Sequence, residues 1–243
     1  MAGDLYWSNV VLLSGWEEPA TLTLAEDESS FSRTIVLGSG AIRTVAQAKH
    51  GTHSVLFDGV NDYASSTTDR ADFYVSNEDF TFEAWIRLDA TDGGVAQMFG
   101  AHYERVGNDR SWFLRKGAGQ TLEFYYYTDG VNANIVSEAF TWVGDTWYHV
   151  AVSRNTTGLR MYVDGVQVGS THNIGTATLH DPDYFFTLGA FASIGFDQNL
   201  YGWMDEFRYT VGVGRYPAAF TAPTLAFPRG PIIPGKHVMI SSM

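Results

Sequence analysis

The chain has 243 residues, of which 45% are hydrophobic and 17% charged, a composition typical of a globular protein with a sizeable core. Its formal net charge of −12 disfavours nucleic acids and anionic membrane surfaces as partners, because both are bound mainly through Lys and Arg. The absence of cysteine excludes disulfides, thiolate metal sites and cysteine nucleophiles.

Period-two alternation of apolar and polar residues recurs along the chain and predicts strands. The aromatic fraction of 15% and the 25 glycines favour strands joined by tight turns. The expected strands, in chain order, lie near 10–13, 32–37, 41–46, 54–57, 80–88, 95–100, 111–115, 122–127, 132–138, 147–152, 161–163, 166–168, 184–189 and 202–209.

Two of these segments predict which face of the strand enters the core, and a further pair predicts a turn. In 80–88, Phe80, Phe82 and the following even-numbered residues are apolar, whereas Glu83, Trp85 and Arg87 share the other face. In 147–152, Trp147 and His149 oppose an apolar face in the same way. Between 161–163 and 166–168, the pair Asp164-Gly165 predicts a two-residue type I′ hairpin turn.

Many short strands without a βαβ rhythm predict an all-β fold, a two-sheet antiparallel sandwich or barrel. Residues 1–227 contain no linker and are expected to form one domain. Residues 228–243 are expected to form a Pro-rich C-terminal tail, because prolines at 228, 231 and 234 prevent a regular strand. We identify no signal peptide and no membrane-spanning segment, so no membrane insertion is expected.

Six segments, in order, resemble the laminin G-like (concanavalin A-like) jelly-roll domains found in phage and bacterial proteins. The resemblance implies a two-sheet jelly roll that covers nearly the whole chain up to about residue 227. The segments are Tyr6–Leu13, Gly51–Gly59, Phe80–Arg87, Trp147–Val152, Tyr162–Gly165 and Met204–Tyr209.

The same resemblance implies one structural calcium ion near the sheet edge. Asp205 is the expected side-chain ligand, with the Gly51 carbonyl as its partner and Glu17 or Glu18 in place of the family's first-strand acid. The alternative is that Asp205 caps a turn or pairs with Arg208.

Aromatic residues suggest a carbohydrate site, since sugar rings stack on aromatic side chains. The expected ligand-binding residues are Trp112, Tyr125, Tyr127 and Trp142. The alternative for each of them is a place in the core or in a subunit interface.

The acidic residues do not favour catalysis. Glycoside hydrolysis needs two converging carboxylates, and no strand carries acids at alternating positions. Asp205 and Glu206 are adjacent and are expected to point to opposite faces. There is no Gly-x-Ser-x-Gly motif, and His149 is expected to be a structural histidine.

We therefore expect a non-catalytic protein, a phage tail or capsid-surface protein that binds host-surface glycan or other virion subunits. It would fold in the host cytoplasm, reach the virion surface by assembly, and could form a homo-oligomer through the tail. A stand-alone bacterial carbohydrate-binding lectin is the first alternative. A glucanase or lyase on the same superfold is the second.

Overall fold

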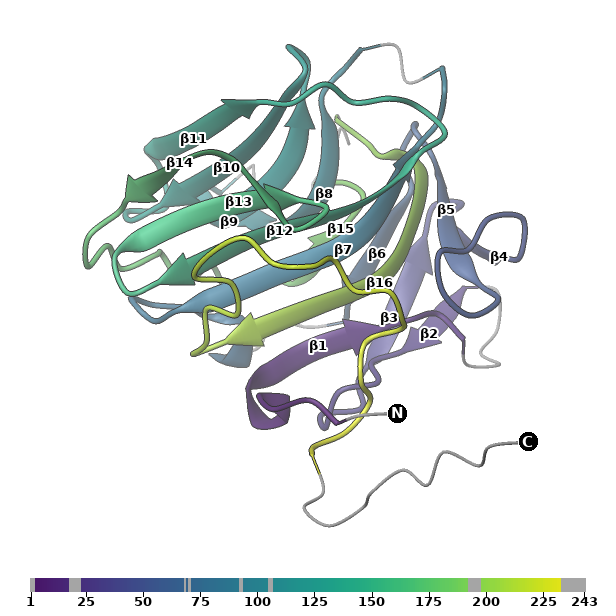
Figure 1. Cartoon of the computed structure of the whole chain (residues 1–243), viewed down its shortest axis with the longest axis horizontal. Coiled ribbons are helices and arrows are strands. Elements are labelled where there is room, and N and C mark those ends of the chain that lie inside the picture. The colour runs from purple at the N-terminus through teal and green to yellow at the C-terminus, as the bar shows by residue number, and fades with distance from the viewer. Residues whose placement is uncertain are drawn as a thin grey trace.

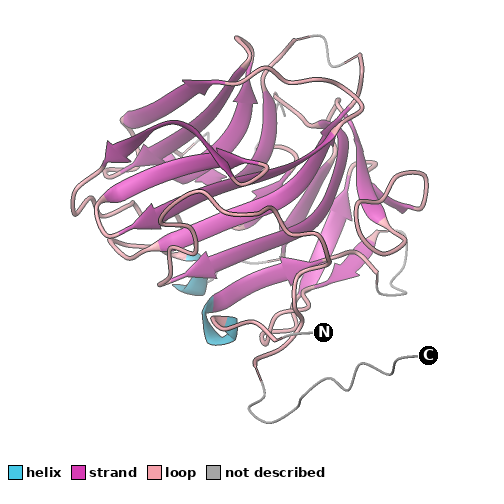
Figure 2. Ribbon diagram, in the orientation of Figure 1, coloured by secondary structure: helices cyan, strands magenta, loops and turns pink. Residues whose placement is uncertain are grey.

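The computed structural model describes residues 3–17, 23–67, 69, 71–91, 94–104, 107–191 and 198–232. Within these residues the chain forms two eight-stranded antiparallel sheets packed face to face, with two short 3-10 turns, Trp7–Asn9 and Ala71–Phe73 (Figures 1 and 2). The predicted all-β, two-sheet jelly roll is confirmed. None of the described helical segments has the length and apolar character needed to cross a bilayer.

Sheet I has the strand order β14-β13-β12-β7-β16-β5-β4, and β1 also pairs with β16. Its members are β1 (Val10–Ser14), β4 (Ile42–Thr44), β5 (Ser54–Asp58), β7 (Phe80–Leu88), β12 (Trp147–Asn155), β13 (Gly158–Val163), β14 (Val166–Asn173) and β16 (Tyr201–Val211).

Sheet II has the strand order β11-β10-β9-β8-β15-β6-β3-β2. Its members are β2 (Leu24–Glu26), β3 (Thr34–Gly38), β6 (Tyr63–Ser66), β8 (Gln97–Glu104), β9 (Asp109–Gly117), β10 (Thr121–Tyr127), β11 (Ala133–Ala139) and β15 (Phe186–Leu188). The short β2 and β6 were not predicted, because Leu24–Glu26 and Tyr63–Ser66 are too short to show alternation.

The main core lies between the sheets and follows the predicted alternation. The even-numbered residues of β7, from Phe80 to Leu88, are fully buried in it. Trp112 of β9 joins them from sheet II, with its ring 5.6 Å from that of Phe82. The hairpin at Asp164-Gly165 is also confirmed: Val163 pairs with Val166, and both turn residues have positive φ, +50° and +79°.

Two segments cover the outer face of sheet I, the face turned away from the core. One is the connection between β4 and β5, residues 45–53. The other follows β16, and Figure 1 shows it in yellow as it crosses in front of β7 and β16. Its contacts fix it there, because the Phe220 N–H donates to the Gly165 carbonyl at 2.9 Å and the Phe227 N–H to Glu206 at 2.7 Å.

The first residues of the predicted tail also contact the sandwich. Arg229 forms ion pairs with Glu206 at 2.7 Å and with Glu28 at 3.0 Å. The Asp4 N–H donates to the Gly230 carbonyl at 2.7 Å, and Asp4 forms a parallel bridge with Pro231. The rest of the predicted tail, 233–243, lies outside the described residues.

Candidate functional site

Three central strands of sheet I, β12, β7 and β16, carry aromatic and charged side chains in two neighbouring rows on the outer face of the sheet. Strand register aligns Trp147 of β12, Arg87 of β7 and Trp203 of β16 in one row. The next row is His149, Trp85 and Asp205. Side chains on one face of neighbouring strands lie within contact distance, so these rows form a continuous surface.

A groove of about 480 Å³ opens over this surface. This volume is in the range of small-molecule sites. Trp85 and Trp147 come from the sheet, Asp164 from the β13–β14 turn, and the remaining residues from the two covering segments. The lining residues are Lys49, His50, Trp85, Trp147, Asp164, Ala222, Pro223 and Thr224.

The groove combines apolar surface with polar groups of both charges. Trp147 is half-buried and Asp164 is exposed. The Lys49 ammonium lies 3.9 Å from the centre of the Trp85 ring, a cation–π contact. The Trp85 indole N–H is buried without a hydrogen-bond partner among the described residues. A stacking ring at Trp147, a hydroxyl acceptor at Asp164 and a donor at Lys49 therefore share one concave site.

His50 lines the groove as a neutral imidazole near pH 7. Burial lowers the pKa of His50, and the neighbouring Lys49 charge lowers it further. Its ring meets Trp85 edge-on at 5.6 Å.

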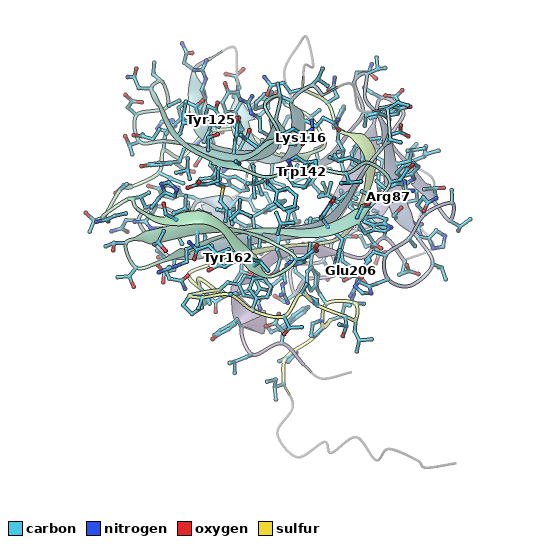
Figure 3. The ribbon with its side chains drawn as sticks, turned by 45° about the horizontal axis from the view of Figure 1, so that its top comes forward. Arg87, Lys116, Tyr125, Trp142, Tyr162 and Glu206 are labelled. Carbon is cyan, nitrogen blue, oxygen red and sulfur yellow. The ribbon has the colours of Figure 1, made fainter. Side chains whose placement is uncertain are left out.

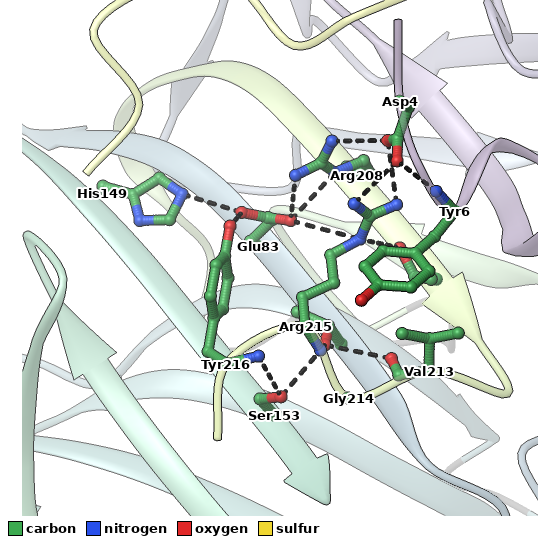
Figure 4. A network of polar contacts seen from close by, with 12 residues as sticks. Asp4, Tyr6, Glu83, His149, Ser153, Arg208, Val213, Gly214, Arg215 and Tyr216 are labelled. Carbon is green, nitrogen blue, oxygen red and sulfur yellow. Dashed lines mark hydrogen bonds and ion pairs between the residues drawn. The ribbon is translucent and has the colours of Figure 1, made fainter. Parts of the chain in front are cut away.

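Beside the groove, Glu83 of β7 is the centre of a buried polar network (Figure 4). One carboxylate oxygen accepts from Arg208 at 2.7 and 2.9 Å, and the other accepts from Tyr216 at 2.6 Å and faces His149 Nε2 at 3.0 Å. Burial alone would raise the pKa of Glu83, but the Arg208 guanidinium and the His149 contact hold it well below its usual range. The structural role expected for His149 is therefore seen.

Asp4 extends the network to the N-terminus. Its carboxylate accepts from Arg208 at 2.8 Å and from Arg215 at 2.9 Å. Because Arg215 and Tyr216 belong to the segment after β16, the network fixes both ends of the domain to the centre of sheet I (Figure 4).

The sequence prediction for Asp205 and Glu206 was wrong in one respect, the face of the strand. Glu206 has φ +47°, and the register of β16 against β7 shifts between Asp205 and Arg208. Met204 and Phe207 both enter the core, so this bulge puts Asp205 and Glu206 together on the outer face. Burial, opposed by N–H donors from the 45–53 segment, raises the pKa of Asp205 to about 7.

The predicted calcium ligands lie around one loop, but hydrogen-bond donors already occupy most of their oxygens. One Asp205 oxygen accepts from the Lys49 and His50 N–H groups at 2.7 and 2.9 Å, as a turn cap would. Glu17 accepts from the Thr52 and His53 N–H groups and from the Thr52 hydroxyl. Gly51 lies between these two carboxylate contacts.

The described residues do not fit a calcium site at Asp205. Calcium takes six to eight oxygen ligands, and Asp205 offers one buried carboxylate oxygen without a partner among the described residues. The described part of the chain contains no group of three or more acidic or histidine side chains placed to hold a metal. Glu18, the remaining predicted ligand, lies outside the described residues.

Three of the four predicted sugar-binding aromatics are buried, which corrects that part of the prediction. Trp112 is fully buried in the main core and donates to the Tyr209 hydroxyl at 3.2 Å. Trp142 lies between the sheets and donates to the Thr121 carbonyl at 3.0 Å (Figure 3). Tyr127, 4% exposed, packs against Tyr103 in a second aromatic cluster that does not belong to the main core.

Tyr125 remains partly exposed, on sheet II (Figure 3). Its ring stacks on Phe113 with 4.3 Å between centroids, and its hydroxyl accepts from Arg115 at 2.8 Å. The structure therefore does not bring Tyr125 together with Trp112 or Trp142. It brings together Trp85 and Trp147, whose outward direction the alternation had indicated, and Lys49, which no sequence pattern pointed to.

Comparison with known proteins agrees with the fold. Residues 58–210 match the family model described as the concanavalin A-like lectin/glucanases superfamily. A search of curated proteins found no match.

Among solved structures, the chain is similar to toxin binding domains. The receptor-binding domain of botulinum neurotoxin D matches at a TM-score of 0.62 and 14% identity, over 84% of this chain and 50% of that one. The binding domain of Paraclostridial Mosquitocidal Protein 1 matches at a TM-score of 0.65 and 14% identity, over 84% and 49%.

A third structure, the botulinum neurotoxin serotype D ligand-binding domain in complex with N-acetylneuraminic acid, matches at a TM-score of 0.62 and 14% identity, over 84% of this chain and 48% of that one. The chain thus spans about half the length of these domains.

Proposed function

Because the chain belongs to the concanavalin A-like lectin/glucanases superfamily, we propose that it is a non-catalytic binding protein that recognises carbohydrate through the groove on sheet I. The observation that carries this proposal is the pairing of Trp85 and Trp147 in a groove of about 480 Å³ that also contains Asp164 and Lys49. Aromatic faces bind the C–H faces of sugar rings, while charged groups hydrogen-bond the hydroxyls.

Two further observations support binding rather than catalysis. Both oxygens of Glu83 accept hydrogen bonds or face His149, and Glu206 is paired with Arg229. A hydrolytic pair needs one carboxyl that can give a proton and one that can reach the sugar or a water. The similar toxin structures are themselves described as binding domains, one of them in complex with a sialic acid.

We propose further that the protein acts in a phage particle, as a tail or capsid-surface protein that contacts host-surface glycan or neighbouring virion subunits. This rests on the family resemblance of its motifs. A stand-alone bacterial lectin is the second candidate, favoured by the groove itself, because a purely structural subunit has no need of a concave aromatic site. A glucanase or lyase is the least supported candidate.

A glycan array probed with the purified chain tests the proposal. We expect binding to a defined set of glycans and an affinity about tenfold weaker, or ~1.4 kcal/mol, for Trp147→Ala. Trp203→Ala is the matched control, because Trp203 lies on the same face but does not line the groove. Tyr125→Ala tests the surface of sheet II.

Equal loss of affinity in Trp203→Ala, or loss of affinity only in Tyr125→Ala, would contradict the placement of the carbohydrate site in the groove. A folded wild type that binds no glycan and forms oligomers would favour a structural virion subunit instead. Release of reducing ends from a bound glycan would contradict the non-catalytic part of the proposal.

A further inference from the structure

Lys49 holds a positive charge at the groove that no carboxylate of the described residues neutralises. Its side chain forms no ion pair among the described residues, and its contact is with the Trp85 ring at 3.9 Å. The Asp205 carboxylate accepts a hydrogen bond from the Lys49 backbone N–H and not from the Lys49 ammonium. The ammonium therefore keeps its hydrogen-bond donors for solvent or a ligand.

Other cations of the same face are paired. Arg87 meets Asp145 at 2.8 Å, Arg208 meets Glu83 at 2.7 Å, and Arg229 meets Glu206 at 2.7 Å. In a chain of net charge −12, an unpaired ammonium inside a concave aromatic site is a local exception to the acidic surface. Charges farther away than the Debye length, about 8 Å in physiological salt, are largely screened, so a bound ligand meets chiefly the charges that line the groove, Lys49 and Asp164.

Asp164 adds a negative charge and a hydrogen-bond acceptor to the groove, so its lining carries both signs of charge. One Asp164 oxygen accepts the His149 N–H at 2.8 Å, and the other, without a partner among the described residues, can accept from a sugar hydroxyl. Its negative charge repels an anionic group from that side of the groove. An anion on the ligand is therefore favoured at Lys49, and its hydroxyl groups are favoured at Asp164.

We infer that the groove binds an acidic pyranose, a sugar ring that bears a carboxylate or a sulfate. This inference rests on the proposed function and assigns the class of glycan. The anionic group meets the Lys49 ammonium in a charge-assisted hydrogen bond, and the ring stacks on Trp147. A neutral sugar uses the same ring and hydroxyl contacts but leaves the ammonium without an anion.

The test is a glycan panel in matched sets, in which each glycan occurs as a neutral, a carboxylated and a sulfated form, at 0.15 M salt. We expect wild type to bind an acidic form about tenfold more tightly than its neutral counterpart. Lys49→Gln should lower the affinity for the acidic form about tenfold more than the affinity for the neutral form, so that the preference disappears, and Lys49→Arg should retain it. The carboxylated and sulfated arms identify which anion the site prefers.

Arg160→Gln is the charge control, because Arg160 belongs to β13 of the same sheet but does not line the groove. Wild type that binds neutral and acidic forms equally, or Lys49→Gln that keeps the preference, would overturn the inference while the proposed function stands. Equal loss in Arg160→Gln would show a general charge effect and also overturn it. Absence of binding to every form would overturn the proposed function, and this inference with it.

Discussion

At the residue scale, the buried network around Glu83 is the feature with the largest expected effect on stability. Glu83 is fully buried between Arg208, His149 and Tyr216. Removing one partner of a buried ion pair leaves the other charge uncompensated, which typically costs about 3–5 kcal/mol. The network therefore depends on Glu83 being ionised.

We expect Glu83→Gln to lower the free energy of unfolding at pH 7 by about 3–5 kcal/mol in urea denaturation. Because the folded state depresses the pKa of Glu83, its contribution is present above the unfolded value of about 4.5 and is lost as the pH falls below it. The difference between wild type and variant should therefore narrow from pH 6 to pH 3. A difference that stays constant over this range would contradict the argument. Glu123→Gln, on sheet II, is the control for a half-buried acid.

The Asp205 carboxylate gives a second prediction at this scale. Because N–H donors occupy one of its oxygens, and N–H and hydroxyl donors occupy those of Glu17, we expect EDTA to leave the melting temperature of the wild type unchanged. Thermal melts with EDTA and with added CaCl₂ measure this. Binding of calcium to the folded state alone would add about 2.7 kcal/mol at a hundredfold excess over Kd. A fall with EDTA that calcium reverses would contradict this prediction.

At the element scale, the β13–β14 hairpin supports one end of the groove. Its turn presents Asp164 to the groove, and the Gly165 carbonyl accepts from Phe220 of the covering segment. Gly165 has φ +79°, and a Cβ atom there would lie 2.0 Å from the Phe220 carbonyl oxygen. Only glycine satisfies both the turn and the close approach.

We expect Gly165→Ala to destabilise the protein by at least about 1–2 kcal/mol, the usual cost of left-handed backbone for a residue with a Cβ atom. The clash with Phe220 should also displace the covering segment and weaken glycan binding. Calorimetry and the glycan array measure the two effects. Gly175→Ala is a matched control, because Gly175 also has positive φ, +58°, but a Cβ atom there meets nothing within 4 Å. An equal loss of binding in both variants would contradict a role for Phe220.

At the scale of the whole molecule, residues near both ends of the described chain form ion pairs that attach them to the sandwich. Asp4 and Arg215 are paired, and Arg229 joins Glu28 to Glu206. Residues up to 231 thus contribute contacts to the domain. Of the predicted tail, 233–243 contains Ile233, Val238, Met239 and Ile240, apolar residues for which a partner surface is expected.

We expect deletion of 233–243 to leave the melting temperature nearly unchanged and to reduce assembly, as measured by sedimentation. Deletion of 228–243 should lower the melting temperature as well, because it removes Arg229 and leaves the buried Glu206 unpaired. Equal melting temperatures for the two truncations would show that Arg229 adds nothing. Unchanged sedimentation of the shorter deletion would contradict the role in assembly.

Local sequence patterns were enough to predict the fold class and the direction of the side chains in the regularly alternating strands. Alternation in 80–88 and 147–152 is local, so it fixed which residues of these strands face the core, and Asp164-Gly165 fixed the hairpin. Which aromatic side chains are buried and which line the groove depends on packing between distant segments, so it could be seen only in the folded structure. Trp112 fills the core, Tyr127 packs in the second aromatic cluster, and Trp85 and Trp147 lie beside segments from residues 45–53 and 212–227. The bulge at Glu206 could not be predicted either. Its two acids contact residues far along the chain, Asp205 the Lys49 N–H and Glu206 the Arg229 guanidinium, and no local pattern encodes contacts between such distant segments.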